Sequence, residues 1–169
     1  MDWAEFTLAL AAFLASHVIP VRLRGPLVAH LGRRGYVIGY SLLSLSLLYW
    51  LILAAGRAPY VEIWPQALWM RWLVNIVMPL AILAAVLGGM AGLMAGFALW
   101  SGAHLLANGD LAHMLFFGLM LAYAGFGLSL AVRRPLRLRP GWRRWLMALA
   151  VWAALFHLHP WLIGVSPAP

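Results

Sequence analysis

Long apolar stretches alternate along the chain with short segments that carry most of its charge. An α-helix rises about 1.5 Å per residue, so about 20 mostly apolar residues cross the roughly 30 Å hydrocarbon core of a bilayer. Stretches of this kind occupy residues 3–21, 36–55, 70–87, 90–107, 111–132 and 142–163. The pattern predicts an all-α polytopic membrane protein, with one transmembrane domain over residues 1–169 that is a bundle of about six helices.

The third and fourth predicted spans have no charged residue between them. The 38 residues that separate Arg71 from Asp110 carry no formal charge. As a single helix they would extend about 57 Å, far beyond a bilayer core. Paired glycines interrupt a helix at the lowest steric cost. We therefore expect these two spans to form a tight hairpin at Gly88-Gly89.

The 12 basic residues are all arginine, and most of them fall into two clusters. These clusters comprise Arg22, Arg24, Arg33 and Arg34, and Arg133, Arg134, Arg137, Arg139, Arg143 and Arg144. A hairpin at Gly88-Gly89 places both clusters on one side of the membrane, which the positive-inside rule identifies as cytoplasmic. Both chain termini are then periplasmic.

A formal net charge of +8 is also typical of domains that bind nucleic acid. Here, however, the two arginine clusters are expected to be short loops next to predicted spans, where they orient the helices and contact anionic lipid headgroups. We therefore expect the lipid bilayer, and not nucleic acid, to be the partner of these arginines.

The absence of lysine and cysteine excludes several chemistries. Without lysine there is no Schiff base and no P-loop, and without cysteine there is no thiolate nucleophile, disulfide or iron–sulfur cluster. The chain has four acidic residues, too few and too scattered for a paired-carboxylate hydrolase. Histidine is therefore almost the only side chain left that is able to hold a cofactor.

Several histidines are expected near the periplasmic ends of the helices. His104, His113 and His159 fall at similar depth there, close to Asp110. Neutral imidazole is a ligand for haem iron, zinc and copper, so His104 and His159 are candidate metal ligands and His113 a further cofactor ligand. Asn108 and Asp110 are candidates to orient the imidazoles. Alternatively, each histidine simply bonds to a neighbouring helix or to interfacial water.

Small residues recur at helical spacing in two of the spans. Gly88, Gly92 and Gly96 share one face, and Gly118, Ala122 and Gly125 share another. Faces of this kind let a neighbouring helix backbone approach closely, so we expect helix packing at both.

At the two ends of the chain, the first span lacks a basic start, and we expect it to be retained rather than cleaved. Residues 166–169 are expected to fray.

Five segments resemble the NnrU family of bacterial membrane proteins, most specifically the run from Phe97 to Asp110. The run reads Phe97-Ala-Leu-Trp-Ser-Gly-Ala-His-Leu-Leu-Ala-Asn-Gly-Asp110. The other segments are His17 with Arg22-Leu-Arg24 and Leu31-Gly32, Tyr40-Ser41 through Trp50-Leu51, Ala58-Pro59-Tyr60-Val61 with Trp64, and His159 through Gly164. The resemblance covers most of the chain.

The resemblance implies a protein of the bacterial inner membrane that is linked to nitrite and nitric oxide metabolism in denitrification. The family is related to zeta-carotene isomerase, a membrane enzyme with haem b, whose histidine ligands would fall on His17 and His104. It resembles isoprenylcysteine carboxyl methyltransferases more distantly. This chain lacks the Arg-His-Pro element of that cofactor region before its fourth span, so S-adenosylmethionine is not expected.

The expected spans place His17 and His104 about 15 Å apart along the membrane normal. Axial nitrogens on one iron lie about 4 Å apart. On spacing, His104 therefore pairs with His159 or His113 before His17.

We expect, first, a haem b protein that uses these intramembrane histidines in nitrogen-oxide metabolism. A second hypothesis is a non-enzymatic subunit or scaffold that packs against membrane protein partners or a second copy of itself. A third is an isoprenoid- or carotenoid-modifying isomerase. No residue is assigned a catalytic role.

Overall fold

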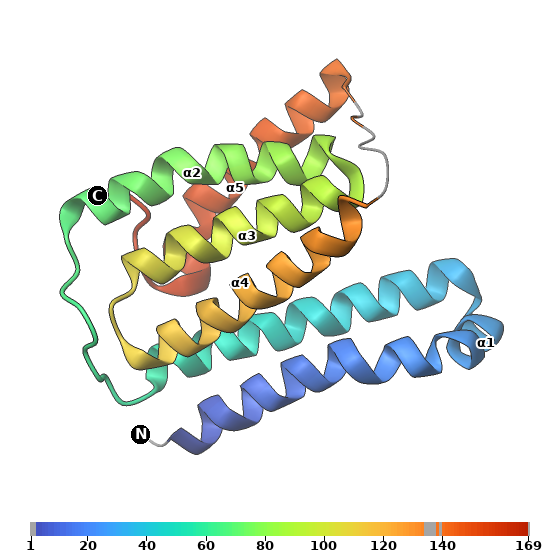
Figure 1. Cartoon of the computed structure of the whole chain (residues 1–169), viewed down its shortest axis with the longest axis horizontal. Helices are drawn as coiled ribbons and strands as arrows, with labels where there is room; N and C mark the ends of the chain where they lie inside the picture. Colours follow the sequence, from blue (N-terminus) through green and yellow to red (C-terminus); the bar gives the residue numbers. More distant parts are fainter. Residues whose placement is uncertain (1–2, 134–137, 139, 169) are drawn as a thin grey trace. The chain divides into compact units, whose positions relative to one another are not determined.

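The computed structural model describes residues 3–133, 138 and 140–168, without the side chains of residues 18–22. Helices make up most of the described chain (Figure 1). They are α1 (Trp3–Arg57), α2 (Leu68–Leu87), α3 (Gly89–Ala107), α4 (Leu111–Ala131) and α5 (Trp142–Ile163). Because α1 joins two helices at a non-helical residue, Gly32, the described residues form six helices. The all-α prediction is confirmed.

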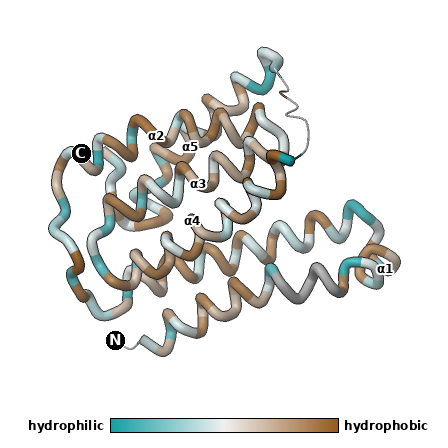
Figure 2. The backbone as a smooth tube through the Cα atoms, in the orientation of Figure 1, coloured by the Kyte–Doolittle hydropathy of each residue, from teal (hydrophilic) through white to brown (hydrophobic). Residues whose placement is uncertain are grey.

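Five segments of the described chain are long and apolar enough to cross a membrane. They are Leu23–Arg57, Leu68–Leu87, Gly89–Ala107, Leu111–Ala131 and Trp142–Ile163. Hydrophobic residues run along these helices in Figure 2, and many large apolar side chains on them are exposed, such as Ile76 and Phe126. Hydrocarbon solvates such surfaces and water does not, so the polytopic membrane prediction is confirmed. The first predicted span, residues 3–21, includes undescribed side chains and stays a prediction.

The chain divides into two compact units, Met1–Tyr60 and Val61–Pro169. In the first unit, the two halves of α1 form a hairpin on either side of Gly32 (Figure 1). Gly32 has φ 69° and ψ 162°, a conformation that glycine adopts more readily than other residues. This one residue therefore breaks the helix.

Polar side chains connect the start of α1 to its end, at the open end of this hairpin. Trp50 Nε1 donates a hydrogen bond to Glu5 Oε1 over 3.2 Å, and Arg57 Nη2 lies 3.1 Å from the same oxygen. The pairing joins the first turns of α1 to its last turns. Glu5 is thereby neutralised by a basic residue of the same unit.

The segment between the first two predicted spans is helical, which corrects the expected loop. Residues 23–31 and 33–35 continue α1 on either side of Gly32. Arginine and leucine are good helix formers, so charge alone did not end the helix. The side chain of Arg22 lies outside the described residues, as do Arg134, Arg137 and Arg139 of the second cluster.

In the second unit, α2 and α3 turn back on one another at Gly88, as predicted. A Cβ on Gly88 would lie 2.5 Å from Gly92 Cα. A Cβ on Gly92 or Gly96 would collide with the backbone oxygen of Ala84 or Ala81, respectively. The glycine face of α3 therefore lies directly against the backbone of α2, which confirms the packing expected there.

The second predicted small-residue face, on α4, is open at its two glycines within the described structure, and its packing role stays a prediction. Added Cβ atoms at Gly118 and Gly125 would meet nothing within 4 Å among the described residues. Helix α4 packs on α3 through other positions, while α5 packs on α2 (Figure 1). The buried residues of α4 are Ala112, Phe116, Phe117, Met120 and Ala124.

Candidate functional site

The turn between α3 and α4 is held by the chain segment that precedes α2. The carbonyl oxygen of Gly109 accepts hydrogen bonds from the backbone N–H groups of Ile63 (2.7 Å) and Trp64 (3.1 Å). Leu111 N–H donates to Val61 O over 2.9 Å. A Cβ on Gly109 would collide with the carbonyl oxygen of Trp64, so a glycine is needed there. These bonds fix the start of α4.

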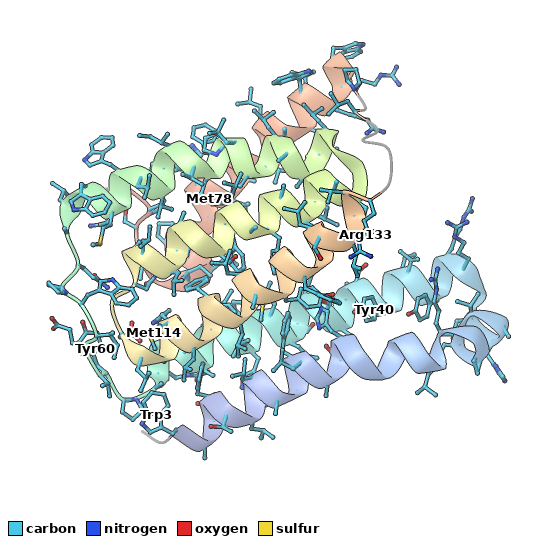
Figure 3. All side chains as sticks on the ribbon, in the orientation of Figure 1. Trp3, Tyr40, Tyr60, Met78, Met114 and Arg133 are labelled. Carbon is cyan, nitrogen blue, oxygen red and sulfur yellow. The ribbon has the colours of Figure 1, made fainter. Side chains whose placement is uncertain are left out.

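Asp110 is a buried carboxylate that caps α4 and binds an imidazole. The residue is 5% exposed, and its Oδ1 accepts a hydrogen bond from the backbone N–H of His113 over 3.2 Å. Its Oδ2 lies 2.7 Å from His113 Nδ1. A carboxylate accepts, so His113 carries its proton on Nδ1 and neutral His113 has a lone pair on Nε2. Met114, the next residue, is labelled in Figure 3.

His104 is oriented by the backbone of its own helix and by two aromatic rings. Its Nδ1 donates to the carbonyl oxygen of Trp100 over 2.9 Å, which leaves the lone pair of the neutral ring on Nε2. The ring centroid lies 5.6 Å from that of Trp100 and 5.3 Å from that of Phe117. His113 stacks on the same Phe117 at 6.1 Å. The rings of His104 and His113 therefore both contact the ring of Phe117.

The side-chain amide of Asn108 bonds to the backbone of His104 and not to its ring. Asn108 Nδ2 donates to the backbone oxygen of His104 over 2.8 Å. It secures the last turn of α3 and thus positions the His104 backbone. Its predicted role in orienting an imidazole stays a prediction.

His159 comes from α5 and completes a group of three histidines. Its Nδ1 donates to the carbonyl oxygen of Val165 over 2.6 Å, which again leaves the lone pair on Nε2. This bond joins His159 to the segment that follows α5. His157 of the same helix is exposed and makes a ring contact with Phe156.

His17 lies in the first unit, on α1. Its Nδ1 lies 2.8 Å from Phe13 O, and its Nε2 lies 3.3 Å from Ser44 Oγ. Tyr40, labelled in Figure 3, contacts the ring edge-on at 6.0 Å between centroids. Both nitrogens of His17 therefore have hydrogen-bond partners within α1.

A family model for NnrU protein matches residues 5–167, nearly the whole chain. The chain belongs to the NnrU family. No curated protein and no solved structure matches it. The match extends over both compact units and includes His17 as well as the three histidines of the second unit.

The donor set of this NnrU chain suits an axial haem ligand. His104, His113 and His159 each have Nδ1 bound to a fixed oxygen acceptor, as metal-binding histidines commonly do. Haem iron takes one or two protein ligands, whereas a structural zinc ion takes four. Among the described residues, no group of three or more histidine or acidic side chains is arranged to hold a metal ion.

The sequence did not reveal a pair of residues that hold the end of the NnrU chain. Arg71 Nη2 donates to the carbonyl oxygens of Ser166 (2.9 Å) and Ala168 (2.5 Å), and Asn75 Nδ2 donates to that of Pro167 (2.7 Å). These hydrogen bonds hold residues 166–168 and oppose the expected fraying, whereas Pro169 lies outside the described residues. A signal was present, because Arg71 and Asn75 are polar residues four apart in an apolar helix and so share a face.

Proposed function

We propose that this NnrU protein binds haem b, with His104 as one axial ligand and His113 or His159 as the other. The observation that carries the proposal is the shared arrangement of the three rings. Each has Nδ1 committed to an oxygen acceptor and the lone pair of its neutral form on Nε2. A histidine held in this way presents a fixed tautomer to a metal.

The surroundings of His104 also favour a flat, apolar cofactor. Phe97 stacks on Trp100 at 5.1 Å between centroids, and Trp100 meets Phe117 edge-on at 5.3 Å. Such rings contact a porphyrin favourably and keep water from the iron. Bound haem supplies an iron that changes oxidation state and binds nitric oxide, and this is the proposed link to nitrite and nitric oxide metabolism in denitrification.

Absorption spectroscopy of the protein purified from haem-replete cells tests the proposal. We expect a Soret band for the natural chain and its loss in His104→Ala. His157→Ala is the matched control, since His157 is an exposed histidine of α5 whose ring contacts Phe156. A folded natural protein without a Soret band contradicts the proposal, as does equal haem content in His104→Ala.

The second ligand is identified by comparing three further single variants. We assign His104 as the ligand that retains the haem, so loss of the other histidine leaves the haem bound to His104 and converts it from low-spin to high-spin, which shifts the Soret band without removing it. We expect this shift in either His113→Ala or His159→Ala, and no shift in His17→Ala. A shift in His17→Ala instead would support the ligand pair implied by the related isomerase.

A second candidate function is that of a membrane subunit or scaffold. It is favoured by the open face at Gly118 and Gly125, where an added Cβ meets no described atom. Small residues left uncovered on a membrane helix admit a close partner helix. This function predicts co-purification with a partner or a second copy, lost in Gly118→Leu with Gly125→Leu and insensitive to His104→Ala. A monomeric chain without a partner contradicts it.

We also propose that the arginine-rich segments are cytoplasmic and that both termini are periplasmic in the inner membrane. The positive-inside rule supports this orientation. The chain contains no cysteine, so single cysteines can be introduced without background. A membrane-impermeant maleimide added to whole cells should label Ala58→Cys and leave Leu138→Cys unlabelled. The reverse pattern contradicts the orientation.

A further inference from the structure

A hollow lies at the turn of the α1 hairpin, within the first unit. It has a volume of about 550 Å³ and is lined by Arg24, Gly25, Val28, Arg33, Tyr36 and Val37. A second hollow of about 410 Å³ is lined by Arg33, Arg34, Val37 and Ile38. Arg33 and Val37 line both, so the two hollows adjoin. The two hollows form where the positive φ of Gly32 interrupts the helix between Arg24 and Arg33.

The arginines of the two hollows have no counterion within the described part of the chain. No hydrogen bond or ion pair is recorded there for Arg24, Arg33 or Arg34. The described carboxylate of the same unit, Glu5, is bound to Arg57. Three positive charges in one place repel each other and attract an anion from outside.

The lining combines this charge with an apolar wall. Val37 and Ile38 are 51% and 60% exposed, and the apolar surface continues along α1 to Leu42 and Leu45, which are 61% and 62% exposed. Ile38, Leu42 and Leu45 follow helical spacing, so they lie near one face. Figure 2 shows the same contrast, with hydrophilic positions at the α1 turn and hydrophobic positions along the helix beyond it. The site therefore suits a molecule with an anionic end and an apolar chain.

We propose that these two hollows bind the phosphate group of an anionic membrane lipid, with an acyl chain lying along Ile38, Leu42 and Leu45. Guanidinium groups bind phosphate oxygens through paired, charge-assisted hydrogen bonds. The apolar wall favours a lipid over a free phosphate ion, because the ion has no apolar chain to contact it. The proposal uses residues of the first unit and does not depend on haem binding at His104.

Native mass spectrometry of the full chain in detergent, titrated with phosphatidylglycerol or phosphatidylcholine, tests this site. Each arginine near an anionic membrane contributes about fivefold in affinity. We therefore expect Arg24→Gln/Arg33→Gln/Arg34→Gln to weaken phosphatidylglycerol binding about a hundredfold. The matched control, Arg133→Gln/Arg143→Gln/Arg144→Gln, removes three arginines of the second cluster, which line neither hollow, and should weaken binding far less than the first triple variant does. Equal losses in the two triple variants overturn the site.

Two further measurements, on the natural chain and on a single variant, test the site even if the triple variant misfolds. The natural chain should bind phosphatidylglycerol at least tenfold more tightly than phosphatidylcholine, and Arg33→Gln alone should lose about fivefold. Equal binding of the two lipids overturns the proposal. Displacement of the lipid by an equal concentration of inorganic phosphate also overturns it, because the site would then belong to a free anion.

Discussion

Gly92→Ala tests the packing of α3 on α2 most sharply. The added methyl group would collide with the carbonyl oxygen of Ala84, and its next contact would be the Ala84 carbonyl carbon at 3.1 Å. These are backbone atoms of a helix, so they cannot rotate away and the two helices must separate. Overpacking of this kind costs about 1–3 kcal/mol. The higher helix propensity of alanine returns up to about 1 kcal/mol.

Because the collision is with backbone atoms, the cost lies near the upper end of that range, and the net expectation for Gly92→Ala is a loss of about 2 kcal/mol of unfolding free energy. For a chain of this length, each kcal/mol shifts Tm by about 2–4 °C. Thermal unfolding in detergent, followed by size-exclusion chromatography with fluorescence detection, measures that shift. Gly118→Ala and Gly125→Ala are the controls, since an added Cβ there meets open space, and each should keep or slightly raise Tm. A Tm for Gly92→Ala equal to the controls would refute the reasoning.

Two further predictions concern the bonds that frame the histidine group. Asp110→Ala removes the cap of α4 and the acceptor for His113 Nδ1, so it should cost about 1–2 kcal/mol of stability. Asp110→Asn should keep most of that stability, and equal Tm losses in the two variants would contradict the cap. Arg71→Ala should release residues 166–168 and speed their hydrogen exchange, whereas Arg57→Ala should not. Unchanged exchange in Arg71→Ala would show that Arg71 does not hold this segment.

The sequence predicted the helical elements well, because membrane spans follow simple limits of length and charge. The last predicted span, residues 142–163, has the bounds of α5, and the hairpin at Gly88 forms where the long uncharged stretch had to turn. The error lay at residues 22–34, where an arginine-rich segment was expected to be a loop. Arginine is a good helix former, and only the positive φ of Gly32 breaks the helix.

The candidate site was predictable in part. The common depth of His104, His113 and His159 was predicted from their positions near helix ends, and in the structure His104 and His113 contact the same ring, that of Phe117. The Nδ1 partners were hidden, because Val165 is six residues from His159 and its carbonyl approaches only when the chain end folds back. Hydrogen bonds of this kind depend on tertiary structure and leave no spacing pattern.

The two glycine patterns differed in how well they predicted helix packing. Gly92 and Gly96 face a helix backbone, whereas Gly118 and Gly125 meet nothing among the described residues, although both sets have similar spacing. Small residues allow close approach but do not specify the partner. Whether such a face is used depends on which helices the connections bring together, and this information lies outside the motif.

The central claim is that His104 holds haem, and the ratio of haem to protein tests it most directly. The pyridine haemochrome assay gives this ratio for the natural chain, His104→Ala and the control His157→Ala, each confirmed as folded by a single symmetric size-exclusion peak. We predict about one haem per chain in the natural protein and in the control, and almost none in His104→Ala. A folded natural chain without haem, or an unchanged ratio in His104→Ala, would contradict the account.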